Sequence, residues 1–194
     1  MASFILASSS PRRRDLLKNL GLTFDVQPAD LDETPLAGEV PSLYVQRLAR
    51  EKAEAVAARF PGAFVLAADT TVALGADILG KPHDAADALR MLTRLSGTSH
   101  EVFTGVALAG PSRSAEVRVS RTEVTFRPAT EAELRWYIST GEPLDRAGSY
   151  AMQGQGGFLV ESLTGSPTNV IGLPLAETLA LLSAAGLPLA WRRG

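Results

Sequence analysis

The sequence predicts an α/β fold with a mixed, partly antiparallel sheet and flanking helices. In the first half of the chain, apolar strand-like segments alternate with segments of helical periodicity, a pattern typical of parallel strands joined by helices. In the second half, two segments with alternating apolar residues flank Gly110-Pro111, which predicts an antiparallel hairpin. We expect residues 1–194 to form a single domain, because a chain of this length can bury one core without dividing.

The first strand-to-helix junction is strongly indicated by its residue types. Residues 4–7 are apolar and are followed by a run of serines that ends at Ser10. Ser10 suits the N-cap of a helix, Pro11 suits the first helical position, where no N–H is needed, and Gly21 suits the end of the helix. The segment therefore reads as a strand, a turn and a short helix.

Hydrophobic periodicity and turn residues place the other elements. We expect further strands at residues 23–26, 63–74, 101–109 and 117–126, and further helices at residues 42–60, 84–95, 130–139 and 174–183. Asp84 suits an N-cap, and Thr130 with Glu133 three residues later has the pattern of a capping box. The stretch 28–41 is polar and contains prolines, which predicts a loop.

The composition excludes several classes of function. Lys and Arg together number 19 and Asp and Glu 21, which gives a net charge of −2, so no overall field favours nucleic acid or an anionic membrane. The absence of cysteine excludes disulfides, thiolate nucleophiles and Cys-ligated zinc. The apolar run at the N-terminus is too short for a signal peptide or a membrane span. We therefore expect a cytoplasmic protein with neither nucleic acid nor membrane as a partner.

The densest candidate site lies at the first junction, where Ser8 and Ser10 precede Arg12, Arg13 and Arg14. Hydroxyl groups, the amides of a helix start and guanidinium groups are all suited to holding phosphates. The alternative is a capped helix with a solvated basic first turn, but cations there oppose the helix dipole. Successive helical positions are about 100° apart, so the three arginines cannot all face one ligand.

Asp69 is the second candidate, because it interrupts an apolar strand. An ionised carboxylate is expensive to bury unless it is paired or coordinates a metal. It is a natural ligand for magnesium or manganese and can act as a general base on water. The alternative is a carboxylate at a strand end that is bonded to backbone.

Weaker candidates come from a helix, two loops and a turn. Lys52 lies on the amphipathic helix and Lys81 in a turn after the strand of Asp69; an ordinary solvated lysine is the alternative at both positions. Glu33 belongs to an acidic loop that could supply metal ligands. Gln153 lies in the glycine-rich stretch 148–157, which allows close backbone approach to a base or is simply a flexible loop.

Five short segments, taken together in their order and spacing, resemble one known family. They are Leu6 to Arg13, Ala68 to Thr70, Gly80 to Pro82, Leu144 to Tyr150, and Asn169 to Pro174. On these segments the chain resembles the Maf family of nucleotide pyrophosphatases, and the resemblance extends over nearly its whole length.

The resemblance implies a mixed α/β fold like that of inosine triphosphatases, with two lobes around a cleft, and often a homodimer. It implies a divalent metal, Mg²⁺ or Mn²⁺, and hydrolysis of a nucleoside triphosphate between the α- and β-phosphates. By the matching motifs, Asp69 is expected as proton acceptor or metal-linked base, and Glu33 as an acidic residue that helps to place the metal or the water. The residues expected to set substrate choice are Arg12, Thr70 and Gln153, and those expected to neutralise phosphate charge are Arg13, Lys52 and Lys81.

Within the family, the motifs resemble the branch that acts on dTTP and UTP. Three departures bear on that assignment: Arg146 stands where lysine is usual, and Ser149 and Ala151 replace Ala and Gly. Arginine and lysine are not equivalent where phosphate is held by two hydrogen bonds. The alternatives are a pyrophosphatase that prefers 7-methyl-GTP and a non-catalytic nucleotide-binding regulator of cell division. An acidic residue in a dry strand favours an enzyme, because nucleotide binding alone does not require it.

Overall fold

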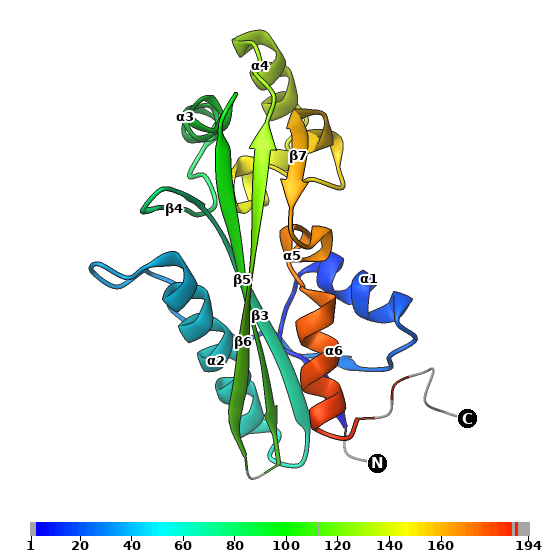
Figure 1. Ribbon diagram of the computed structural model, residues 1–194. Helices are drawn as coiled ribbons and strands as arrows, with labels where there is room; N and C mark the ends of the chain where they lie inside the picture. The colour runs from blue at the N-terminus through cyan, green and yellow to red at the C-terminus, as the bar shows by residue number, and fades with distance from the viewer. Residues whose placement is uncertain (1–2, 112, 188, 190–194) are drawn as a thin grey trace. The chain divides into compact units, whose positions relative to one another are not determined.

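The computed structural model describes residues 3–111, 113–187 and 189, and Figure 1 shows how helices and strands follow one another. The strands are β1 Phe4–Leu6, β2 Asp25–Val26, β3 Phe64–Leu74, β4 Asp77–Leu79, β5 Ser99–Gly110, β6 Arg113–Phe126 and β7 Val160–Thr164. The α-helices are α1 Pro11–Asn19, α2 Pro41–Arg59, α3 Ala85–Leu95, α4 Glu131–Ser139, α5 Pro167–Ile171 and α6 Leu175–Ala184. Short 3₁₀ turns are η1 Glu142–Asp145, η2 Ala147–Ser149 and η3 Gln155–Leu159.

The strands form a mixed sheet in the order β2-β1-β3-β5-β6-β7, with β4 paired to β3. β1 runs parallel to β2 and β3, whereas β4 is antiparallel to β3 and β7 is antiparallel to β6. β5 and β6 are neighbours, as the predicted hairpin requires. The predicted mixed sheet with flanking helices is therefore confirmed.

The chain divides into two compact units. The first contains the residues up to Asp69, residues 104–120 and the residues from Gly172 onward, and the second contains residues 70–103 and 121–171. No helix among the described residues is both long enough and apolar enough to cross a membrane.

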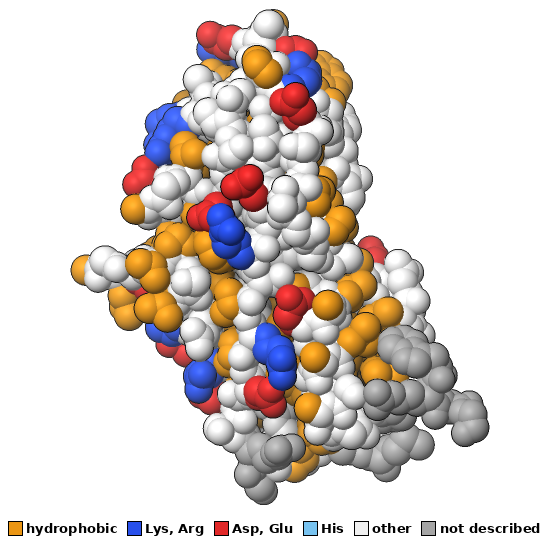
Figure 2. All heavy atoms as spheres, viewed as in Figure 1, with side chains coloured by type: hydrophobic (Ala, Val, Ile, Leu, Met, Phe, Trp, Pro, Cys, Tyr) orange, Lys and Arg blue, Asp and Glu red, His pale blue; other side chains and the backbone are white. Residues whose placement is uncertain are grey.

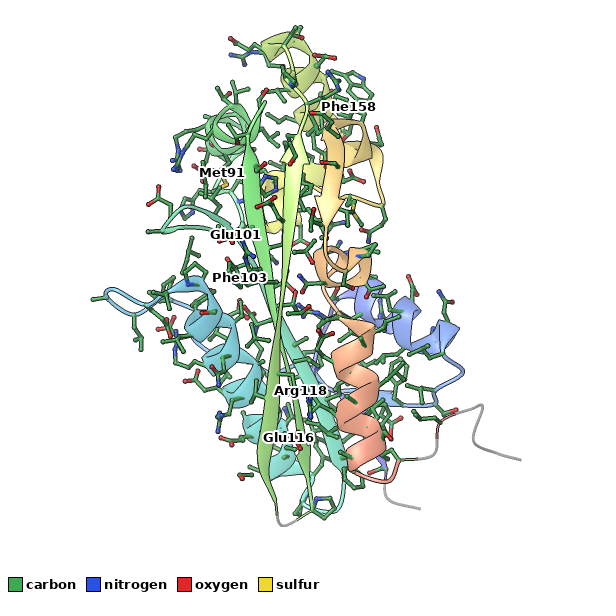
Figure 3. All side chains as sticks on the ribbon, viewed as in Figure 1. Met91, Glu101, Phe103, Glu116, Arg118 and Phe158 are labelled. Carbon is green, nitrogen blue, oxygen red and sulfur yellow. The ribbon has the colours of Figure 1, made fainter. Side chains whose placement is uncertain are left out.

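In the first unit, helices pack on both faces of the strands. Neighbouring residues of a strand point to opposite faces, so Leu6 joins an apolar cluster with residues of α1 and α6, whereas Ile5 joins a second cluster with residues of α2. α2 approaches the strands closely, because a Cβ added to Gly105 of β5 would lie 2.2 Å from the carbonyl oxygen of Val45. On β6, Glu116 and Arg118 lie two residues apart on one face (Figure 3). Nη2 of Arg118 lies 3.1 Å from Oε1 of Glu116, which makes an ion pair.

In the second unit, the core forms between α3, α4, the end of β6 and η3. Its buried members include Leu92, Leu134, Tyr137, Phe126 and Leu159. The capping box predicted at the start of α4 is present, with the hydroxyl of Thr130 accepting from the backbone N–H of Glu133. The N-cap predicted at Asp84 is present as well.

The predicted elements are found with small shifts in their bounds, and three short elements were not expected. α2 begins at Pro41 because proline fits the first turn of a helix. The missed elements are β4, α5 and β7. β4 has three residues and α5 five, too few for periodicity to register, and β7 is mostly exposed without an alternating pattern.

Candidate functional site

The junction between β1 and α1 holds the side chain of Arg13 in place. The Oγ atom of Ser8, which is buried, accepts a hydrogen bond from Nη1 of Arg13 at 3.0 Å and another from the backbone N–H of Ser10 at 3.2 Å. Nε of Arg13 donates to the carbonyl oxygen of Gly172 at 2.7 Å. Ser10 occupies the predicted N-cap position, but its side chain makes no capping hydrogen bond. The junction therefore fixes a guanidinium group rather than only starting a helix.

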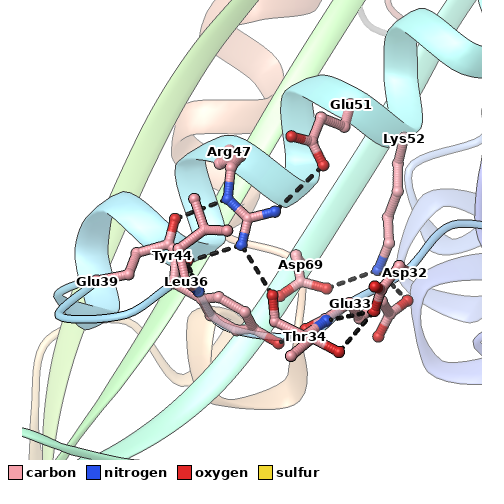
Figure 4. A network of polar contacts seen from close by, with 10 residues as sticks. All are labelled: Asp32, Glu33, Thr34, Leu36, Glu39, Tyr44, Arg47, Glu51, Lys52 and Asp69. Carbon is pink, nitrogen blue, oxygen red and sulfur yellow. Dashed lines mark hydrogen bonds and ion pairs between the residues drawn. The ribbon is translucent and has the colours of Figure 1, made fainter.

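Beside this junction, Lys52 joins two carboxylates. Its Nζ atom lies 2.6 Å from Oδ1 of Asp69 and 2.6 Å from Oε1 of Glu33. Lys52 is 8% exposed and Asp69 is 6% exposed, whereas the side chain of Glu33 is 53% exposed. Figure 4 shows the ammonium of α2 reaching both carboxylates, one from β3 and one from the loop before α2. Asp69 is thus paired with a side chain, which excludes the alternative of a carboxylate bonded only to backbone.

The surroundings of Asp69 raise its pKa above the ordinary value of an aspartate. Burial is the largest cause, and the nearby charge of Glu33 adds to it, while the charges of Lys52 and Arg13 act in the opposite direction. Burial lowers the pKa of Arg13 below its ordinary value, and the charges of Asp69 and Glu33 act in the opposite direction. The first unit therefore gathers Arg13, Glu33, Lys52 and Asp69 into one cluster of two cations and two anions. Arg12 follows Pro11 in the first turn of α1 and is partly exposed.

The remaining sequence-predicted residues, Thr70, Lys81 and Gln153, belong to the second unit. Nζ of Lys81 lies 2.5 Å from Oδ1 of Asp145, and the backbone N–H of Gly148 donates to the carbonyl oxygen of Gly80 at 3.1 Å. These contacts join the turn of Lys81 to the segment around η2. Gln153 is exposed, and Thr70 is partly exposed on β3.

The glycine-rich segment is packed against Glu142 and Tyr137. Oε2 of Glu142 accepts from the hydroxyl of Tyr137 at 2.8 Å and from the backbone N–H of Gly156 at 3.0 Å. A Cβ added to Gly154 would lie 1.9 Å from Glu142, and one added to Gly156 would lie 2.4 Å from Tyr137. These two glycines therefore allow the backbone to approach a tyrosine and a glutamate.

At the start of the same segment, Ser149 has a φ of 61°, in the left-handed region, and is fully buried. Its Oγ atom lies 3.3 Å from Sδ of Met91 on α3, which Figure 3 labels. A Cβ on the preceding Gly148 would lie 2.7 Å from Val72. The small side chains at this turn are thus explained by packing in the second unit.

Comparison with known proteins identifies the family. Residues 3–185 match the family described as Maf-like protein. The chain belongs to the Maf family. This agrees with the resemblance carried by the five sequence segments.

Curated relatives of this Maf protein match over almost their full length. One from Myxococcus xanthus (strain DK1622), named dTTP/UTP pyrophosphatase, is 64% identical over 188 residues, which cover 97% of this chain and 95% of that protein. Another of the same name, from Anaeromyxobacter dehalogenans (strain 2CP-C), is 57% identical over 192 residues and covers 97% of each chain.

Solved structures support the fold of this Maf protein. The Staphylococcus aureus Ham1 protein matches with a TM-score of 0.53 and 14% identity, covering 94% of this chain and 99% of that one. A HAM1 protein from Coxiella burnetii matches with a TM-score of 0.52 and 14% identity, covering 95% and 100%. At such low identity the likeness shows the fold alone.

Sequence reasoning missed three residues that shape this Maf protein around its candidate site residues. Tyr44 and Arg47 on α2 hold the backbone of the loop that carries Glu33, and Glu142 holds the glycine-rich segment. The glycines at positions 154 and 156 indicated that another group packs closely against the backbone there, but the sequence does not show which residue supplies it. No sequence pattern indicated the hydrogen bond of Tyr44.

Proposed function

We propose that this protein hydrolyses dTTP and UTP to the nucleoside monophosphate and pyrophosphate, with the help of a divalent metal. The observation that carries the proposal is the buried Asp69, paired with Lys52 beside Glu33 and Arg13. This arrangement occurs in a chain that is 64% identical to a protein named dTTP/UTP pyrophosphatase.

Asp69 is the proposed general base. The oxygen of a water molecule attacks the α-phosphorus, the bond from that phosphorus to the bridging oxygen breaks, and pyrophosphate leaves with the electron pair. The proton of the water passes to Asp69. Burial makes this carboxylate a stronger base by raising its pKa, and the ammonium of Lys52 at 2.6 Å favours the ionised form that can accept the proton.

The cations of the cluster are proposed to hold the triphosphate. Arg13 is fixed by Ser8 and Gly172, so little side-chain entropy remains to be lost when phosphate binds. The ammonium of Lys52 has three N–H donors, and it makes one contact with the carboxylate of Glu33 and one with that of Asp69. Fixed positive charge of this kind stabilises the charge that develops on phosphate oxygens in the transition state.

The acidic residues fit a divalent metal. Asp69 and Glu33 both lie 2.6 Å from one cation, the ammonium of Lys52, and Mg²⁺ is commonly bound through one or two carboxylates together with substrate phosphates. Among the described residues there is no group of three or more acidic or histidine side chains that could hold a metal alone. We therefore propose that Asp69 and Glu33 would bind the metal together with the phosphates of the substrate. The metal would add positive charge at those phosphates.

The substrate-binding roles of the other residues rest on the family resemblance. Arg12, Thr70 and Gln153 are proposed to set substrate choice, and Lys81 to neutralise phosphate charge. Ser8 and Ser10 are proposed to bind phosphate through the junction. A homodimer is also proposed, which light scattering during size-exclusion chromatography tests.

The reaction is tested with dTTP, UTP, CTP and 7-methyl-GTP in Mg²⁺ or Mn²⁺, with the products assigned by phosphorus NMR. We expect pyrophosphate from dTTP and UTP, and its loss when a chelator is added. Pyrophosphate mainly from 7-methyl-GTP would overturn the proposed roles of Arg12 and Gln153. Tight nucleotide binding without turnover would overturn the proposed enzyme and indicate a regulator.

The assignment of the base is tested by Asp69→Asn. Because the amide cannot accept the proton, turnover should fall by a factor on the order of 10² to 10⁴, while nucleotide binding measured by calorimetry stays close to wild type. Lys52 keeps Glu33 as a partner, and thermal unfolding checks that the variant is folded. Asp77→Asn is the matched control, since Asp77 is an exposed aspartate paired with Arg94. Turnover of Asp69→Asn at the rate of the control would refute the assignment.

A further inference from the structure

The loop that carries Glu33 lies between β2 and α2 and is almost entirely exposed. Beyond Glu33 its apolar side chains do not anchor it, because Leu36 is 59% exposed and the adjoining Val40 is 50% exposed, whereas Ala29 near its start packs against the second apolar cluster. Burial therefore does not explain how this part of the loop keeps one conformation, and Figure 2 shows hydrophobic side chains exposed on the surface where Figure 1 places the loop before α2. A loop of this length without helix or strand needs other anchors.

Arg47 on α2 supplies one anchor. Its Nε and Nη2 atoms donate to the two carboxylate oxygens of Glu39, each at 2.7 Å, and Nη2 also donates to the carbonyl oxygen of Thr34 at 3.3 Å. Glu39 in turn accepts from the backbone N–H of Leu36 at 3.0 Å. A planar guanidinium that meets a carboxylate with two hydrogen bonds fixes direction as well as distance.

Tyr44 supplies the second anchor. Its hydroxyl donates to the carbonyl oxygen of Glu33 at 2.8 Å. Tyr44 and Arg47 are three residues apart and therefore lie on the same face of the helix. From that face they hold two consecutive carbonyl groups, those of Glu33 and Thr34, as Figure 4 shows.

The partner of the Glu33 side chain comes from the same helix. Lys52, which meets Glu33 at 2.6 Å, lies on α2 together with Tyr44 and Arg47. Because α2 is a rigid helix, this one element positions both the side chains that hold the backbone at Glu33 and the lysine whose ammonium contacts the Glu33 carboxylate. We propose that Tyr44 and Arg47 are positioning residues that hold Glu33 beside Lys52 and Asp69, and thereby set the efficiency of the proposed metal-assisted hydrolysis.

This inference rests on the proposed function and specifies how one of its acidic residues is placed. Glu33 is an exposed side chain on an exposed loop, so without the two anchors it would sample many positions. Misplacement of a catalytic group lowers the rate of the chemical step more than it weakens substrate binding. Loss of an anchor should therefore lower kcat, leave KM within about twofold, and raise the Mg²⁺ concentration needed for half-maximal rate.

The test uses Tyr44→Phe, which removes one hydroxyl and keeps the packing, and Arg47→Lys, which keeps the charge and loses the paired hydrogen bonds. We expect kcat to fall about threefold to tenfold in Tyr44→Phe, the loss that one hydrogen bond explains. Glu51→Gln is the matched control, because Glu51 meets Arg47 at 3.3 Å from the helix and not from the loop. Its kcat should equal that of wild type.

A double-mutant cycle decides whether the anchors act through Glu33. If they do, Tyr44→Phe should slow wild type but cause no further loss in the Glu33→Gln background. Equal losses in both backgrounds would overturn the proposal, because the hydroxyl would then act without Glu33. Thermal unfolding of all four proteins confirms that each is folded.

A second readout does not depend on activity. Hydrogen exchange of the Leu36 amide, which is bonded to Glu39, should become about tenfold faster in Arg47→Lys and stay unchanged in Glu51→Gln. Unchanged exchange in Arg47→Lys would overturn the anchoring role. If wild type releases no pyrophosphate, the proposed function fails, whereas the exchange experiment still tests whether Arg47 holds the loop.

Discussion

Asp69 and Lys52 form a buried ion pair in which each residue compensates the charge of the other. A carboxylate on an apolar strand would be costly to ionise alone, and a lysine that is 8% exposed would be costly to charge alone. Their contact of 2.6 Å satisfies both groups. Glu33 brings a second negative charge to the same ammonium, and it is one of the causes that raise the pKa of Asp69. The strength of the proposed base therefore depends on a neighbour that lies on a loop.

The pH dependence of activity should report this coupling. Because Asp69 must be ionised to accept a proton and its pKa is raised, the acidic limb of kcat/KM should lie above the ordinary aspartate pKa of about 3.9. Glu33→Gln removes a negative neighbour, so the pKa of Asp69 falls and the limb moves to lower pH. The variant and wild type are compared on the same substrate, so titration of the phosphates affects both alike. Glu51→Gln serves as the control, and a limb that stays in place or moves upward in Glu33→Gln would contradict the coupling.

At the scale of elements, the sequence is most informative where one local pattern decides the structure. The strand-to-helix junction at Ser10-Pro11 and the capping box at Thr130 were predicted because their signals lie within a few residues. Asp69 was noticed for the same reason, as a charge inside an apolar run. Its partner Lys52 lies 17 residues away, so only the family resemblance related the two. The roles of Tyr44 and Arg47 were not predicted, because they depend on how an irregular loop crosses a helix.

The contact between α2 and β5 gives a prediction for an element. A Cβ on Gly105 would lie 2.2 Å from the carbonyl oxygen of Val45, and helix backbone cannot move aside as a flexible side chain does. Gly105→Ala should therefore lower the free energy of unfolding by about 3 kcal/mol, as overpacking in a core does. Gly62→Ala is the matched control, because its Cβ would meet nothing within 4 Å. Urea unfolding followed by circular dichroism measures both, and equal stabilities would show that helix and strand do not pack this closely.

At the scale of the whole molecule, each compact unit has its own apolar core, but neither unit is one continuous segment. The chain passes between the units after Asp69, Phe103, Ser120 and Ile171. Each unit therefore needs segments that are distant in sequence, and a chain that ended after Asp69, Phe103 or Ser120 would lack part of both units. This also explains why local sequence patterns do not give the bounds of the two units: contacts between distant segments define a unit.

The core of the second unit contains His100, which should make the stability of the protein depend on pH. His100 is 2% exposed, its Nε2 atom lies 2.9 Å from the hydroxyl of Tyr150, and its Nδ1 atom is buried without a hydrogen-bond partner among the described residues. Burial lowers the pKa of His100 to about 4, from an ordinary value of 6.5. Between these two pH values the unfolded chain binds a proton that the folded protein excludes, so the free energy of unfolding falls as the pH drops from about 6.5 to about 4.

This pH effect is measurable by comparing variants. The shift corresponds to about 3 kcal/mol across that window, with no further contribution above or below it. His100→Gln lacks the titrating group, so the difference in unfolding free energy between wild type and this variant should shrink by that amount as the pH is lowered through the window. The same substitution at the exposed His83, His83→Gln, is measured alongside as the control. Urea unfolding at a series of pH values measures all three proteins, and parallel profiles for wild type and His100→Gln would mean that the core accepts a charged histidine.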